Sequence, residues 1–113
     1  MSLDATFAAL SDPTRRAVID LLRRQPRRAG ELAEALAMSP PAMSRHLRVL
    51  RESGLVEEER PDDDARVRML RLRAQPFDDL RDWLDELEQF WTGQLAAFKA
   101  HAQRTRPRAR RRR

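Results

Sequence analysis

The segment Ser39–Leu55, SPPAMSRHLRVLRESGL, constrains the fold more than any other part of this 113-residue chain. Ser39 is typical of a helix N-cap, and a proline follows it at the first helical position, where the missing N–H costs nothing. Gly54 supplies the left-handed residue that ends a helix, and Leu55 is the hydrophobic partner of such a cap. The segment therefore predicts one short helix over residues 39–53.

The two faces of this predicted helix differ in chemistry. Met43, Leu47 and Leu50 recur at i, i+4 and i+7, which places them on one buried stripe. The opposite face carries Pro41, Ser44, Arg45, Arg48 and Glu52. A short helix that is apolar behind and rich in arginine in front fits the major groove of DNA.

A second short helix is predicted immediately upstream, over residues 30–36, with Leu32 and Leu36 on one face. Only residues 37–39 separate it from the arginine-rich helix. Two short helices joined by so tight a turn form a helix-turn-helix, in which the second helix reads the DNA.

The residues after Gly54 predict a β-wing. Residues 55–60 and 66–72 form two strands around a Pro-Asp-Asp-Asp turn, although the alternation of the second strand slips near Met69. The wing arginines are placed to reach the minor groove or the DNA backbone. The candidates are Arg60, Arg66 and Arg68, and Arg66 is the preferred one.

Two helices precede the helix-turn-helix. Leu3, Phe7 and Leu10 recur at helical spacing in a short opening helix, and Asp12 caps a second helix over residues 13–24. Arginines make this region basic, and some of them are expected to lie along DNA phosphates. They are Arg15, Arg16, Arg23, Arg24, Arg27 and Arg28.

The last predicted element is a long helix over residues 76–103. Its apolar residues follow a nearly heptad spacing, and they offer more apolar surface than so small a domain can cover. A twin helix from a second copy, in a two-fold dimer, would cover it, whereas the alternative is a helix folded wholly onto its own core. The predicted dimer contacts are Leu3, Phe7, Leu80, Leu84, Leu87, Trp91, Leu95 and Phe98.

The net charge of +5 is unevenly distributed. Residues 104–113 hold seven of the 23 basic residues and no acid, so the remaining body has 16 basic and 18 acidic residues, a charge of −2. The body must therefore bind DNA through local patches. We expect one domain over residues 1–103, and a disordered arginine-rich tail over residues 104–113 that adds nonspecific affinity or stays solvated.

Composition excludes several function classes. The chain has no cysteine, so disulfides and thiolate metal sites are impossible, and it lacks a glycine-rich phosphate loop and a paired histidine. We therefore expect no enzyme activity, no cofactor and no metal. It has no run of 18 apolar residues and no signal-peptide pattern, so a cytoplasmic protein without a membrane partner is expected.

Three stretches carry a resemblance to a known family: LSDPTRRAVIDLLRR at 10–24, GELAEALAMSPPAMSRHLRVLRESGLV at 30–56, and the predicted wing at 57–72. Over residues 3–100 the chain resembles the ArsR/SmtB family of bacterial winged-helix repressors. Its Phe90-Trp91 pattern is similar to a subgroup of autorepressor-like regulators without metal sites. The resemblance implies a mainly α-helical fold with a two-stranded β-wing, dimerising through terminal helices. It also implies repression by binding a palindromic DNA operator.

The chain departs from the family pattern at the start of the predicted recognition helix. The pair of positions that often reads bases is occupied by Pro40 and Pro41, which have no side-chain donors. Direct readout therefore shifts to Ser44 and Arg45, and an arginine can hydrogen-bond a guanine through two donors. Nearer the backbone are Arg48 and His46, and the histidine is equally placed to pack inside the protein.

Two alternative functions stay open from the sequence. The first is a repressor that senses a small organic molecule near Trp83, Phe90 and Trp91, although such aromatics are more often dimer core. The second is a general nucleic-acid or protein interaction module driven by the terminal helix and the arginine tail. Metal sensing is not expected, because the cysteines of metal-sensing relatives are absent and His101 stands alone near the helix end.

Overall fold

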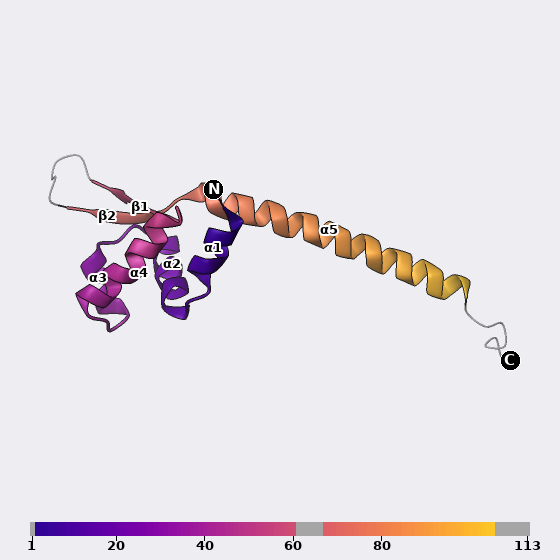
Figure 1. Cartoon of the computed structure of the whole chain (residues 1–113), viewed down its shortest axis with the longest axis horizontal. Coiled ribbons are helices and arrows are strands. Elements are labelled where there is room, and N and C mark those ends of the chain that lie inside the picture. The colour runs from indigo at the N-terminus through magenta and orange to yellow at the C-terminus, as the bar shows by residue number, and fades with distance from the viewer. Residues whose placement is uncertain (1, 61–66, 106–113) are drawn as a thin grey trace. The chain divides into compact units, whose positions relative to one another are not determined.

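The computed structural model describes residues 2–60 and 67–105, and it confirms the predicted mainly α-helical fold with one two-stranded wing (Figure 1). The elements are α1 (Leu3–Leu10), α2 (Pro13–Arg24), α3 (Ala29–Ala35), α4 (Pro40–Glu52), β1 (Val56–Glu59), β2 (Met69–Leu72) and α5 (Ala74–Arg104). The chain divides into two compact units, one ending at Leu80 and the other beginning at Arg81. No helix of the described ranges is long and apolar enough to cross a membrane.

Side-chain caps set the starts of α2 and α4, as predicted. The carboxylate of Asp12 accepts the backbone N–H groups of Thr14 and Arg15 at 2.8 and 3.0 Å. The hydroxyl of Ser39 accepts the N–H of Ala42 at 3.3 Å. Each cap satisfies donors that have no partner inside the first turn of a helix, so these two boundaries are decided by local sequence.

The core of the first unit lies where the helix-turn-helix, α2 and the wing meet. The predicted stripe of α4 is buried, with Met43, Leu47 and Leu50 at most 2% exposed. The other large buried residues are Val18, Leu22, Leu32, Leu55, Val56 and Leu70. Because α4 is anchored along its apolar side, its opposite face is held at a defined orientation on the surface.

Both helices of the helix-turn-helix end on a left-handed residue. Gly54 has a φ of 82° after α4, as predicted, whereas Ala37 has a φ of 53° after α3. The N–H of Met38 donates to the carbonyl of Ala33 at 2.9 Å, and this bond fixes the tight turn before α4. An alanine gives no sequence signal for such a cap, since it rarely adopts this conformation.

The wing is an antiparallel pair in which Val56 lies opposite Leu72 and Glu59 lies opposite Met69. The predicted second strand was too long: it begins at Met69, and Arg68 precedes it. Beyond that pair, the backbone of Leu70 exchanges two hydrogen bonds with Arg27, at 2.8 and 3.0 Å. The wing is thus attached by its backbone to the segment between α2 and α3.

The terminal helix α5 is one continuous helix of 31 residues. It begins two residues earlier than predicted, because Pro76 sits in the first turn, where its missing N–H breaks no helical bond. Every described residue of the second unit, residues 81–105, is exposed. This exposure includes the large apolar side chains that the sequence assigned to a dimer seam.

Candidate nucleic-acid interface

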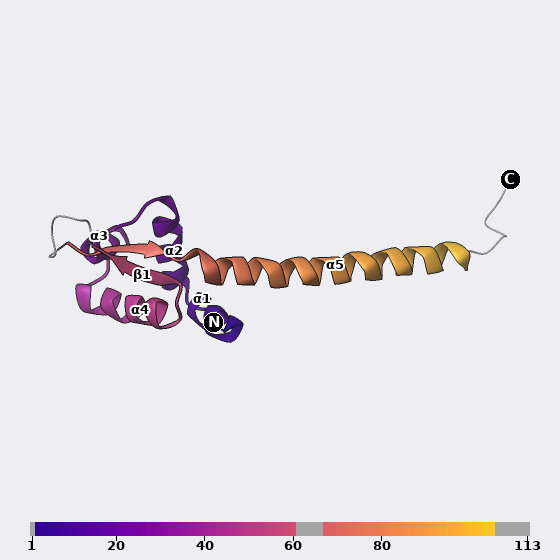
Figure 2. The ribbon, with the colours of Figure 1, turned by 90° about the horizontal axis from the view of Figure 1, so that it is seen from above.

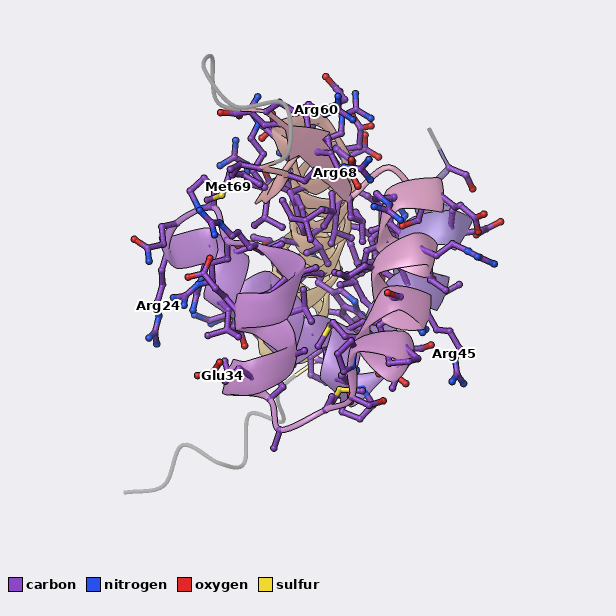
Figure 3. The ribbon with its side chains drawn as sticks, turned by 90° about the vertical axis from the view of Figure 1, so that its left-hand side faces the viewer. Arg24, Glu34, Arg45, Arg60, Arg68 and Met69 are labelled. Atoms are coloured by element: carbon purple, nitrogen blue, oxygen red, sulfur yellow. The ribbon has the colours of Figure 1, made fainter. Side chains whose placement is uncertain are left out.

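The exposed face of α4 carries five of the predicted DNA-contacting residues. They are Pro40, Pro41, Ser44, Arg45 and Arg48, and all five are exposed. Arg45 points outward from the body of the unit (Figure 3). The structure therefore brings these residues together on one surface, with the buried stripe of the same helix behind them.

His46 lies differently, on the flank of α4 and half-buried. Its Nδ1 is 3.9 Å from Oδ1 of Asp12, the residue that caps α2. The backbone N–H of Arg15, donating to that carboxylate, lowers the pKa of Asp12 below its ordinary value of 3.8, and the nearby His46 adds a smaller effect. The structure thus places His46 at the junction of α2 and α4, which fits the packing alternative.

The described wing arginines, Arg60 and Arg68, are exposed at the wing end of the first unit (Figure 3). The preferred candidate of the sequence, Arg66, lies outside the described residues. The acids of β1 would oppose a phosphate, but arginines neutralise them. On the outer face of the wing, Arg71 contacts Glu57 and Glu59 at 3.3 and 3.1 Å.

The basic residues around α2 serve the fold more than the sequence suggested. Arg15 donates to the carbonyls of Ala9 and Ala8 at 2.7 and 3.1 Å, so it caps the C-terminus of α1. Arg16 also donates to the end of α1, at the carbonyl of Leu10, at 2.6 Å, whereas Arg27 donates to the carbonyl of Leu21 near the end of α2, at 3.3 Å. The spacing along the chain could have indicated these caps, because each arginine lies six residues beyond the carbonyl that it contacts near a helix end. The last carbonyls of a helix have no partner within it, so they attract cations.

Two other arginines of that region lie elsewhere on the surface of the first unit. Arg23 pairs with Asp20 on the surface of α2, at 3.7 Å. Arg24 and Arg45 point outward on opposite sides of the unit (Figure 3). Arg24 therefore does not extend the basic surface of α4.

The sequence missed one contact that joins the helix-turn-helix to the wing. Arg51, in the last turn of α4, donates through Nη1 to Oε1 of Glu58 in β1. α4 lies beside β1 (Figure 2). Among the described residues, no group of three or more His, Cys, Asp or Glu is placed to hold a metal ion.

These elements define the class of protein: a winged helix-turn-helix with an arginine-bearing helix exposed beside a two-stranded wing. The family model described as bacterial regulatory protein, arsR family, matches residues 12–58. HTH-type transcriptional regulator Rv2034 of Mycobacterium tuberculosis is 38% identical over 97 residues, which cover 86% of this chain and 85% of that protein. The chain therefore belongs to the arsR family and is a transcriptional regulator.

Two further likenesses agree with this assignment. Transcriptional repressor SdpR of Bacillus subtilis is 38% identical over 58 residues, covering 51% of this chain and 64% of that protein. The solved structure of an ArsR-like transcriptional regulator from Rhodococcus sp. RHA1 superposes with a TM-score of 0.75 and 32% identity. That match covers 91% of this chain and 92% of the Rhodococcus chain.

Proposed function

We propose that this regulator is a homodimeric repressor that binds a palindromic DNA operator, with α4 as the recognition helix in the major groove. The observation that carries the proposal is the exposed face of α4, where Ser44, Arg45 and Arg48 stand on a helix anchored by buried residues. Repression is supported by the likeness to SdpR, a protein named as a repressor. No cofactor is part of the proposal.

Each residue of α4 has a role that follows from its chemistry. Arg45 donates two hydrogen bonds to a guanine, and Ser44 contacts an adjacent base or phosphate. Pro40 and Pro41 make apolar and shape contacts only, because neither side chain carries a donor. Arg48 anchors the helix to the phosphate backbone.

The wing supplies the second contact region. Arg68 is exposed near β2, and we assign it, together with Arg66, to the minor groove or the backbone beside it. His46 is assigned a minor backbone contact at most, because its ring is close to Asp12.

Dimerisation follows from the apolar surface of the terminal helix. Leu84, Leu87, Trp91, Leu95 and Phe98 are between 38% and 70% exposed in the single chain. Fully burying one such side chain contributes about 1.5–3 kcal/mol, so a second copy covering the seam gains a large driving force. The proposed interface also includes Leu3, Phe7 and Leu80.

The proposed division of labour is a DNA-binding and dimerisation body over residues 1–103 and an arginine-rich arm over residues 104–113. Residues 106–113 lie outside the described residues. The seven arginines of the arm would add affinity that does not depend on DNA sequence.

Footprinting on the DNA upstream of the protein's own gene tests the proposal. We expect two protected half-sites, with centres about 34–36 Å apart, because a two-fold dimer places its recognition helices one DNA turn apart. With ~6–10 phosphates engaged, affinity should fall about 10³–10⁵-fold between about 50 and 200 mM salt. The proposal would be contradicted if the protein bound every DNA sequence with the same affinity and that affinity changed little with salt. A variant lacking residues 104–113 should keep the footprint.

A further inference from the structure

A polar groove lies between α4 and the wing. Its volume is about 240 Å³, and it is enclosed by side chains from separate segments of the chain. The charged and hydroxyl-bearing side chains in its lining are Ser44, Arg51, Glu58 and Arg68. Leu47 and Leu70, which are both buried, also line it, so the groove rests directly on the core.

The ion pair between Arg51 and Glu58 crosses this groove from helix to strand. In the register of the wing, Glu58 lies opposite Leu70, so it shares the inner face of the sheet with a core residue. Glu57 and Glu59 are on the outer face, where they contact Arg71. Arg51 and Glu58 are 40% and 30% exposed, so a ligand can reach the pair from outside.

DNA geometry indicates what this groove would meet. If α4 enters the major groove and the wing approaches the adjacent minor groove, one sugar-phosphate strand must pass between them. The groove lies between those two elements. The guanidinium groups of Arg51 and Arg68 and the hydroxyl of Ser44 can donate hydrogen bonds to the oxygens of a phosphate. An arginine matches a phosphate well, because it can donate two parallel hydrogen bonds.

We infer that this groove binds one phosphate of the DNA backbone, with Arg51 and Arg68 as the cationic contacts and Ser44 as a further donor. The inference rests on the proposed mode of DNA binding, and it adds Arg51 to the contacting residues. Arg51 uses Nη1 for Glu58, which leaves its other N–H groups for the phosphate. Glu58 keeps Arg51 over the groove in free protein and weakens phosphate binding by its own charge.

Sequence-independent affinity and its salt dependence distinguish a phosphate contact from base readout. We would measure fluorescence anisotropy with the upstream DNA and with a random duplex, for wild type, R51A, R51K and E58Q. R51A should weaken both complexes by about tenfold and reduce the slope of log affinity against log salt by about 0.9, the value for one phosphate. R51K should recover part of the affinity, because it keeps the charge without the planar fork.

E58Q should change DNA affinity in the opposite direction to R51A. Removing the carboxylate charge while keeping the shape of the side chain should tighten both complexes about two- to fivefold, the range of an exposed charge interaction. R23A is the matched control, because Arg23 is an exposed arginine paired with Asp20 on α2. It should leave affinity and slope unchanged. Thermal melting of every variant establishes that the fold is intact.

Several outcomes would overturn the inference. An unchanged salt slope in R51A, or a loss confined to the upstream DNA, would mean that Arg51 contacts no phosphate. If E58Q bound DNA more weakly than wild type, the pair of Arg51 and Glu58 would have a structural role instead. Competition by inorganic phosphate at constant ionic strength would make the groove a site for free phosphate. If the wild-type protein itself shows no salt-dependent DNA binding, the proposed function fails, which is a separate result.

Discussion

Ala37 stands in a backbone conformation that suits glycine. Its φ of 53° terminates α3, and the same position after α4 is occupied by Gly54 with a φ of 82°. In each cap the residue after it donates to a carbonyl five residues earlier, Met38 to Ala33 and Leu55 to Leu50. The two helices of the motif therefore end alike, but only one of them carries the residue that this geometry favours.

Replacing Ala37 by glycine should stabilise the protein. The left-handed conformation costs an alanine roughly 1–2 kcal/mol, and the greater freedom of an unfolded glycine offsets about 0.4–1 kcal/mol of that gain. We expect the free energy of unfolding to rise by about 0.5–1 kcal/mol in urea denaturation. Gly54→Ala is the matched control and should lower it by about 1 kcal/mol. Destabilisation by both changes would contradict this account.

Asp12 should make stability depend on pH. Because the backbone N–H of Arg15 lowers its pKa in the folded state below 3.8, its stabilising effect is complete above that value. The effect is lost as pH falls through the lower folded-state pKa. Melting temperatures of wild type and Asp12→Ala should therefore differ most near neutrality and converge in acid. A difference that stays constant into strong acid would refute this. Asp12→Asn keeps an acceptor for the cap and serves as the control.

At the scale of the element, α4 combines two requirements. Its buried face holds it on the core, and in the proposed function its exposed face presents donors to a base edge. With Pro40 and Pro41 at its start, the proposed base readout falls to the second turn of the helix. A single arginine there should account for much of the discrimination between operator and random DNA.

Arg45→Ala should reduce that discrimination by about 1–3 kcal/mol, because the two hydrogen bonds to a guanine are lost. Anisotropy titrations on the footprinted site and on a scrambled duplex give the ratio of the two affinities. Arg48→Ala is the control on the same face. It should weaken both complexes alike, since a phosphate contact carries no base information. Equal loss on both duplexes in Arg45→Ala would assign Arg45 to the backbone instead.

At the scale of the whole molecule, the proposed dimer depends on the apolar face of α5. Leu95 and Phe98 are 62% and 70% exposed in the single chain, more than a monomer usually tolerates in one continuous stripe. Binding a palindrome needs two recognition helices, so the proposed operator binding requires the proposed dimer through this helix.

Leu95→Asp should shift the protein to monomer, because a two-fold interface would then bury two like charges. Sedimentation equilibrium measures the shift, and footprinting should show the loss of protection over both half-sites. Gln89→Asp, on the opposite face of the same helix, should leave the dimer intact. A Leu95→Asp dimer of wild-type strength would remove α5 from the proposed interface.

Local sequence determined α4 and the start of α2. The signals that define these helices involve residues close together in the sequence, so they can be recognised without the tertiary structure. They are the caps Asp12 and Ser39, Gly54 after α4, and the apolar stripe through Met43. The exposed face of α4 follows from the same periodicity. This much of the fold and of the candidate site was therefore predictable.

Only the tertiary structure decided which charges remain available to DNA. The sequence cannot show that the backbone of Arg27 pairs with Leu70, or that Arg51 meets Glu58 across a groove. Each of these contacts depends on how the chain brings separate segments together. An arginine has the same charge in every such setting, and its partner determines whether it closes a helix or faces a phosphate.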